Sequence, residues 1–167
     1  MSEAIKGRRS IRKYCDKPVP RDMLDQILES AKAAPSAGNL QARDFFVVTD
    51  SETKQHLVNA AMGQKFIAQA DIVVVVCANS DEIDSYGQRG IELYMIQDSA
   101  ASVQNMLLTA YSLGLGTCWV GAFDESIVIE AMKLPKHFRP VAIIPIGWPD
   151  QSCRERSKRD DDVHFVR

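Results

Sequence analysis

The run Ile72-Val73-Val74-Val75-Val76-Cys77 determines what kind of fold this chain can adopt. Its residues are all apolar, and all but Cys77 are β-branched, which is the composition of a β-strand. Successive side chains of a strand point to opposite faces of the sheet, so a strand that is apolar throughout must be covered on both faces. The run therefore predicts a sheet with helices packed above and below it.

Further strands are expected on both sides of this run in the sequence. Residues 45–49 and 141–147 have strand composition. The second of these segments contains Pro145, which cannot donate to a strand ladder, so we expect its end at a sheet edge or a β-bulge. Residues 116–121 are predicted to form a short strand or a loop.

Two long segments, residues 21–34 and 91–113, carry apolar residues at helical spacing. The second would be about 35 Å long, enough to cross a domain of this size. It is apolar over more than one face, which predicts a buried position, either at the centre of the domain or in a subunit interface.

Shorter elements complete the expected fold. A helix capped at residue 50 or 51 should begin near Glu52, and another capped near Asp124 should span residues 123–132. The polar segment 79–90 is the best candidate for a linker or lid. The pattern predicts one α+β domain over residues 1–167, with one sheet between helices and a long central helix.

Composition narrows the possible functions. A net charge of −2 and a pI near 5.9 leave no excess of cations to drive nucleic-acid binding, so no nucleic-acid partner is expected. No segment has the uninterrupted apolar length of a signal peptide or a membrane span. The four cysteines are widely spaced, without disulfide or zinc-site patterns. A reducing, cytoplasmic environment without a membrane is therefore expected.

Positive charge is concentrated at the two ends of the chain. The segment Arg8-Arg9-Ser10-Ile11-Arg12-Lys13-Tyr14 has only Ile11 and Tyr14 to anchor it, and residues 154–159 carry four more cations. Each group by itself is typical of a solvated basic patch. If the ends meet, as chain termini often do, the two groups could form one phosphate-binding site.

Common catalytic motifs are absent from the sequence. It has no P-loop, no H-E-x-x-H pair and no G-x-S-x-G elbow, and its three histidines are scattered. Gly114, Gly116 and Gly121 fail as a dinucleotide fingerprint, because Trp119 stands where the third glycine is needed. No metal site is expected. The residues instead favour the binding of a cofactor that supplies its own chemistry.

Three stretches, taken in their order and spacing, resemble one family, the FMN-dependent nitroreductases. They are Arg8-Arg9-Ser10-Ile11-Arg12-Lys13-Tyr14, Ala34-Pro35-Ser36-Ala37-Gly38-Asn39-Leu40-Gln41 and Gly114-Leu115-Gly116-Thr117-Cys118-Trp119-Val120-Gly121. The resemblance covers nearly the whole chain. It implies a nitroreductase-like α+β fold with a central, mostly antiparallel sheet. It also implies an interlocked homodimer whose long central helix lies at the interface, with FMN bound between the subunits.

The resemblance also implies roles for individual residues. Arg8 and Ser10 would hold the FMN phosphate and ribityl chain, and Arg12 would reach the pyrimidine side of the ring. Arg156 and Lys158 would complete the phosphate site, and a backbone N–H near Gly121 would face N5. The remaining implied cofactor contacts are Arg9, the partner-subunit loop with Pro35, Ser36, Ala37 and Asn39, Gln64 (or Lys65), and Cys118, Trp119 and Val120. Larger relatives carry helical insertions where this chain has only residues 79–90, so the acceptor pocket is expected to be open or differently roofed.

The physical chemistry of flavins agrees with these assignments. A phosphate with about two negative charges needs several cations and hydrogen-bond donors. A cation beside the pyrimidine edge raises the flavin potential. The resulting hypothesis is an FMN-dependent NAD(P)H oxidoreductase that reduces nitroaromatics, quinones or flavins by ping-pong hydride transfer, with no catalytic side chain. The alternatives are an FMN enzyme of the same fold with another reaction (reductive dehalogenation or flavin fragmentation), a non-catalytic FMN-binding module, and a surface for a polyanionic or acidic partner.

Overall fold

The computed structural model describes residues 2–152 and 163–166. Its strands are β1 (Arg43–Val48), β2 (Ile72–Asn79), β3 (Gly116–Thr117) and β4 (Phe138–Gly147). Its α-helices are α1 (Ser2–Gly7), α2 (Arg21–Lys32), α3 (Ser51–Ala60), α4 (Phe66–Gln69), α5 (Gly87–Arg89), α6 (Met95–Ser112) and α7 (Glu125–Met132). Two 3-10 turns, η1 (Ala37–Asn39) and η2 (Asp84–Tyr86), and a π-helical turn, η3 (Gly90–Tyr94), complete the described elements. None of these helices is both long and apolar enough to pass through a lipid bilayer.

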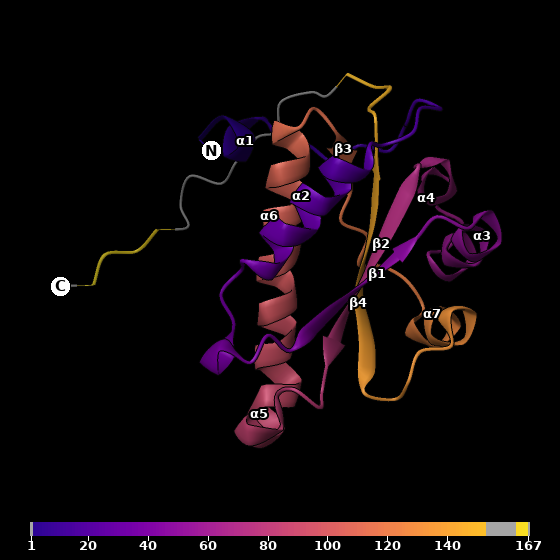
Figure 1. Ribbon diagram of the computed structural model, residues 1–167. Coiled ribbons are helices and arrows are strands. Elements are labelled where there is room, and N and C mark those ends of the chain that lie inside the picture. The colour runs from indigo at the N-terminus through magenta and orange to yellow at the C-terminus, as the bar shows by residue number, and fades with distance from the viewer. Residues whose placement is uncertain (1, 153–162, 167) are drawn as a thin grey trace.

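The four strands form one antiparallel sheet in the order β1-β2-β4-β3. Every residue of β2 is buried, as its unbroken apolar run requires. Two helices, α2 and α6, cover one face of the sheet, and α3, α4 and α7 cover the other (Figure 1). The predicted α+β arrangement, with one sheet between helices and a long central helix, is confirmed.

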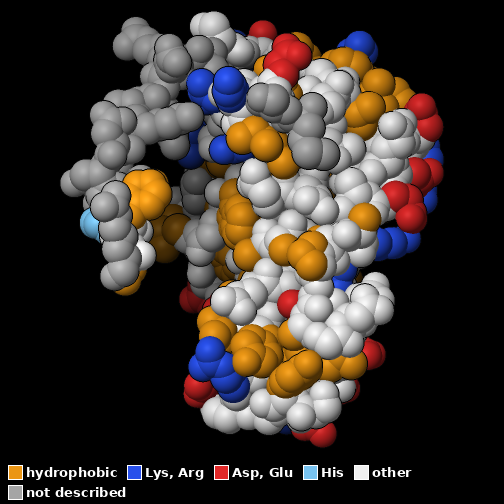
Figure 2. Space-filling view, turned by 90° about the vertical axis from the view of Figure 1, so that its left-hand side faces the viewer, with side chains coloured by type: hydrophobic (Ala, Val, Ile, Leu, Met, Phe, Trp, Pro, Cys, Tyr) orange, Lys and Arg blue, Asp and Glu red, His pale blue; other side chains and the backbone are white. Residues whose placement is uncertain are grey.

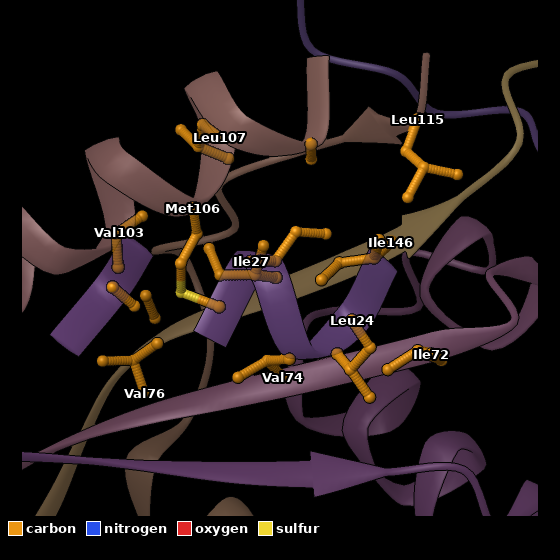
Figure 3. Close-up of a cluster of buried hydrophobic side chains, with 14 of the residues drawn as sticks. Leu24, Ile27, Ile72, Val74, Val76, Val103, Met106, Leu107, Leu115 and Ile146 are labelled. Carbon is orange, nitrogen blue, oxygen red and sulfur yellow. The ribbon is translucent and has the colours of Figure 1, made fainter. Parts of the chain in front are cut away.

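The core between the sheet and the helices α2 and α6 is built from interdigitating aliphatic side chains. Ile27 from α2 and Met106 from α6 point toward Val74 and Val76 of β2 (Figure 3). Each of these four side chains is fully buried. Burying an aliphatic side chain of this size contributes about 1.5–3 kcal/mol, so this layer holds α6 firmly against the sheet.

The prediction for Pro145 is wrong, because β4 lies between β2 and β3 and the β-bulge lies elsewhere. The register shifts at Val76 and Cys77 of β2, where Val141 of β4 has no direct partner. Pro145 pairs with Val73 on one side. The pairing of β3 stops at Thr117 and resumes only at a bridge between Val120 and Ile143. The missing N–H of proline therefore interrupts the outer pairing without placing β4 at the edge.

Helix boundaries follow the predicted caps. The Asp50 side chain accepts a hydrogen bond of 2.7 Å from the backbone N–H of Thr53 at the start of α3. Asp124 accepts one of 2.8 Å from the backbone N–H of Ser126 in α7. The helix predicted from residue 91 becomes regular α-helix only at Met95.

The segment predicted as a linker or lid is more ordered than its polarity suggests. Asn79 is the last residue of β2, and residues 84–94 form successive helical turns that lead into α6. Gly90 makes this path possible, because a Cβ there would lie 2.8 Å from the Cβ of Tyr86 and 2.9 Å from the carbonyl oxygen of Ile83. A role for the segment as a lid stays a prediction.

Candidate functional site

The basic segment is anchored by its two apolar residues. Ile11 and Tyr14 are buried, and the backbone N–H of Ile11 donates to the carbonyl of Thr117 at 2.8 Å. Ser10 forms a parallel bridge with Thr117, which places the segment beside β3. The Tyr14 hydroxyl lies 2.9 Å from the Ile11 carbonyl oxygen, which tightens the turn. Burial raises the pKa of Tyr14, so its hydroxyl stays a neutral donor.

The cations of this segment have different environments. Lys13 forms an exposed ion pair of 2.7 Å with Asp150, and this hydrogen bond raises the pKa of Lys13. Arg9 donates to the carbonyls of Lys6 and Arg8. Arg8 is half-buried as a residue, and its guanidinium has no hydrogen bond or ion pair within the described part of the chain. Arg8 is therefore available to hold an anion, unlike Lys13.

Residues 150 and 151, which follow β4, lie beside this segment. The backbone N–H of Arg12 donates to Oε1 of Gln151 at 2.8 Å, and that of Asp150 donates to the Lys13 carbonyl at 2.9 Å. The chain thus returns to the basic segment at residues 150 and 151, and the approach of the cations of residues 154–159 stays a prediction. Arg156 and Lys158 lie outside the described residues.

A cavity of about 590 Å³ opens next to Arg8 and Arg9. Its walls come from α1, the end of α6 and β3, and they include Thr117 and Gln151. Gly116 is required here by a close approach, since a Cβ would lie 2.7 Å from the Ile11 side chain. This volume lies in the ordinary range for small-molecule sites.

The side chain of Arg12 has different neighbours from that of Arg8. Its guanidinium carbon lies 5.9 Å from the centre of the Phe66 ring, in cation–π range. Phe66 begins α4, and Gln64 lies two residues before it, half-buried, with its side-chain amide donating to the Ala61 carbonyl. The fold thus brings Arg12 and the region of Gln64 to the same side of the basic segment, while Lys65 is exposed.

The stretch after β3 alternates between core and surface. The side chains of Cys118 and Val120 are buried in the core, so only their backbone could face a cofactor. Trp119 is 40% exposed, which excludes a core role for it. Gly121 is exposed, and a Cβ there would have Trp119 Nε1 as its nearest neighbour, at 3.8 Å. A second cavity, of about 330 Å³, opens beside Gly121 and includes Glu92 and Arg139 in its walls.

The loop of residues 35–39 lies away from the basic segment. It follows the far end of α2, at the opposite end of α6 from α1 (Figure 1). Pro35 and Asn39 are exposed, and Asn39 has a φ of 58°. The Ser36 hydroxyl accepts from the backbone N–H of Gln41 at 3.1 Å. One protomer therefore does not bring this loop together with Arg8, Ser10 and Arg12.

Sequence reasoning missed three residues that support this loop. Arg43, Asp98 and Ser102 are buried and linked to the loop or to each other by hydrogen bonds. Burial lowers the pKa of Arg43, although the negative charge of Asp98 opposes that shift. Asp98 and Ser102 lie one helical turn apart on the same side of a helix, which is the signal that could have indicated a polar cluster.

The nitroreductase family model matches residues 5–65 and 56–148, which together include most of the described fold. The chain belongs to the nitroreductase family.

Individual relatives agree with this assignment. An oxygen-insensitive NADPH nitroreductase of Salmonella typhimurium is 36% identical, over 88% of this chain and 65% of its own length. An FMN reductase (NAD(P)H) of Bacillus subtilis is 33% identical, over 93% of this chain and 70% of its own. The solved structure of an FMN-dependent nitroreductase from Clostridium difficile R20291 is similar with a TM-score of 0.85 and 30% identity, over 100% of this chain and 99% of that one.

Proposed function

We propose that the protein is an FMN-dependent NAD(P)H oxidoreductase whose electron acceptors are nitroaromatics, quinones or flavins. Its family and the activities of its relatives support the oxidoreductase class and FMN as the cofactor. The observation that carries the proposal for this chain is the uncommitted guanidinium of Arg8 at the cavity beside β3.

The residues present fit an FMN molecule. Its phosphate needs a cation that no carboxylate already neutralises, and Arg8 meets this condition while Lys13 is paired with Asp150. A flat ring needs backbone that it can approach closely, and Gly121 is open where a side chain would project. Bound FMN would supply the redox chemistry, by accepting a hydride from NAD(P)H and passing it to the acceptor.

The role proposed for the chain's own residues is to bind and orient FMN. Arg8 and Ser10 are assigned to the phosphate and ribityl chain, and Arg12 to the pyrimidine edge of the ring. The backbone N–H near Gly121 is assigned to the ring edge that carries N5, and Trp119 to the same side of the site. Arg9 is expected to contribute less to phosphate binding than Arg8, because its guanidinium already donates to two carbonyls.

The proposal includes a homodimer in the cytoplasm, where NAD(P)H is available. The separation of the loop 35–39 from Arg8 within one protomer supports a site shared between two copies. Apolar side chains extend down the face on which α6 lies (Figure 2). Five apolar residues of η3 and α6 are only half-buried: Leu93, Ile96, Ala100, Leu108 and Tyr111. A second copy packed there would bury them.

The decisive experiment is a spectrum of the purified protein. We expect yellow protein, or colourless protein that becomes yellow with one FMN per chain, and a flavin absorption band that bleaches anaerobically with NADH or NADPH. Colourless protein that takes up no FMN would overturn the proposal. Size-exclusion chromatography with light scattering tests the dimer, for which twice the mass of 18.6 kDa is expected.

The same assay distinguishes the proposed function from two alternative functions. An enzyme for reductive dehalogenation or flavin fragmentation would bind FMN but bleach slowly with NAD(P)H. A non-catalytic binding module would bind FMN and turn over no acceptor. Rapid bleaching followed by reoxidation with a quinone or a nitroaromatic compound excludes both.

A further inference from the structure

Arg43, the first residue of β1, is a buried residue whose side chain forms hydrogen bonds with the backbone at the C-terminal end of α2. Its side chain is only 6% exposed. Nη2 donates to the carbonyls of Lys32 at 2.9 Å and Ala34 at 3.1 Å, and Nε donates to the Ser102 hydroxyl at 2.8 Å. The carbonyls at a helix C-terminus lack partners within the helix and carry partial negative charge, so a buried cation there is favourable.

Asp98 in α6 holds the following residues of the same loop. Its side chain is buried, and Oδ1 accepts a hydrogen bond of 2.9 Å from the backbone N–H of Ala37. Ser102 connects the two charged residues, because its hydroxyl accepts from Arg43 and donates to the Asp98 carbonyl at 3.1 Å. Hydrogen bonds thus hold the backbone on both sides of residues 35 and 36, at the carbonyl of Ala34 and at the N–H of Ala37.

This cluster is incompletely satisfied within the described residues. Nη1 of Arg43 and Oδ2 of Asp98 are both buried and have no hydrogen-bond partner there. Buried charges are costly, and replacing such a pair with apolar groups often leaves a protein equally stable or more so. A role in setting one particular local conformation therefore accounts for the cluster better than stability does.

The loop has a conformation that needs such support. Gly38, Asn39 and Gln41 all have φ between 56° and 58°, a region that non-glycine residues adopt only under constraint. Two of these three residues are not glycine. Without Arg43 and Asp98, we expect the backbone between α2 and β1 to adopt several conformations of similar free energy.

We propose that Arg43 and Asp98 are positioning residues, which clamp the backbone of residues 34–37 in the geometry that the FMN site requires. The inference rests on the proposed function, in which this loop contacts the flavin bound against the partner subunit. Arg43 fixes where the loop leaves α2, and Asp98 fixes how Ser36 and Ala37 are presented. Neither side chain touches the cofactor.

The test compares Arg43→Met, Asp98→Ala and the double variant with the intact protein. Each single variant removes one of two opposite buried charges that attract each other, and should unfold at a lower temperature. The double variant removes both charges, so its Tm should recover above that of Arg43→Met. Its Kd for FMN, measured by fluorescence titration of the apoprotein, should nevertheless stay raised by about 10- to 100-fold, as expected for a displaced positioning group.

A second readout does not depend on FMN. In the apoprotein of the double variant, backbone amides of residues 36–41 should exchange with solvent at least about tenfold faster than in the intact protein, while those of β2 stay protected. Val128→Ala is the matched control, because it removes fully buried atoms from α7 on the other face of the sheet. It should lower Tm without changing the Kd or the exchange of the loop.

Each outcome supports or overturns the inference. If the Kd of the double variant recovers together with Tm, or if loop exchange is unchanged, Arg43 and Asp98 are not positioning residues. If the intact protein binds no FMN, the proposed function fails, and the exchange rates alone then decide whether the cluster clamps the loop.

Discussion

The hydroxyl of Tyr14 lies 3.3 Å from the carbonyl oxygen of Pro145, a residue 131 positions later in the chain. The backbone N–H and carbonyl of Ile143 both pair with Val120, so Pro145, two residues further along β4, faces the same side. Proline has no N–H, and Pro145 lies at the gap between the β3 pairs and the bridge of Val120 with Ile143. Tyr14 occupies that gap and so attaches the basic segment to the sheet.

Replacing Tyr14 with Phe should therefore weaken both the fold and the site. The variant loses the single buried O–H donor that lies between the carbonyls of Ile11 and Pro145, which should lower the free energy of unfolding by about 1–3 kcal/mol. The turn that carries Arg12 should loosen, so FMN should bind less tightly. Urea denaturation and FMN titration measure the two effects. Tyr86→Phe changes an exposed tyrosine and should stay within about 0.5 kcal/mol; an equal loss in both variants would contradict the argument.

Arg8→Ala should mainly weaken the retention of FMN. The loss of charge-assisted hydrogen bonds to a phosphate, about 1.5–3 kcal/mol, corresponds to a Kd raised by roughly 10- to 100-fold. Lys13→Ala is the matched control, because Lys13 is already paired with Asp150. Its Kd should change less than about threefold, as for an exposed ion pair. Equal losses in the two variants would show that the cations act only as a general positive field.

Arg12→Ala should change the flavin's reactivity more than its retention. A positive charge at the pyrimidine edge favours the reduced flavin, so its removal should lower the midpoint potential and slow turnover by about tenfold. Spectroelectrochemical titration of the FMN-loaded protein measures the potential. Arg12→Lys keeps the charge and should restore most of the potential, whereas a potential unchanged in Arg12→Ala would place this residue away from the ring.

Two glycines close in sequence should respond oppositely to replacement by alanine. A Cβ at Gly116 meets the Ile11 side chain at 2.7 Å, so Gly116→Ala should destabilise the fold by about 1–3 kcal/mol. At Gly121 the nearest atom is 3.8 Å away, so Gly121→Ala should leave Tm nearly unchanged. If the flavin lies against Gly121, the added methyl group should still raise the Kd for FMN. An unaffected Kd would remove Gly121 from the site.

The helix caps predict a pH dependence of stability. Hydrogen bonds from Thr53 lower the pKa of Asp50, and those from Ser126 and Ile127 lower the pKa of Asp124, both from 3.8. A carboxyl whose pKa is lower in the folded state stabilises the protein fully above its unfolded value. That contribution is lost as the pH falls through the folded value. Asp50→Ala with Asp124→Ala should thus destabilise at pH 7, and the difference from the intact protein should shrink below pH 3.8.

The control for the caps is the pair of asparagine variants. Asparagine caps a helix about as well as aspartate but does not ionise. Asp50→Asn with Asp124→Asn should lose little stability at pH 7. Urea denaturation between pH 7 and pH 3 tests both pairs, and an alanine variant whose deficit persists undiminished at low pH would contradict the assignment.

Local pattern was sufficient to predict much of this fold. The run from Ile72 to Cys77 predicted a fully buried strand, and Asp50 and Asp124 predicted the starts of two helices. These predictions hold because periodicity and capping depend on residues within a few positions of each other. Pro145 was misplaced because whether a strand lies inside a sheet or at its edge depends on which distant segments pair with it.

The sequence by itself determined the class of fold, the family motifs and the anchoring of the basic segment by Ile11 and Tyr14. Only the tertiary structure decided which cations are available. It pairs Lys13 with Asp150 and leaves Arg8 facing a cavity. It also joined Asp98 to the amide of Ala37, 61 positions away, and placed Arg43 beneath the same loop. The physical reason is that charge neutralisation and desolvation depend on neighbours in space, and those neighbours are chosen when the helices pack on the sheet.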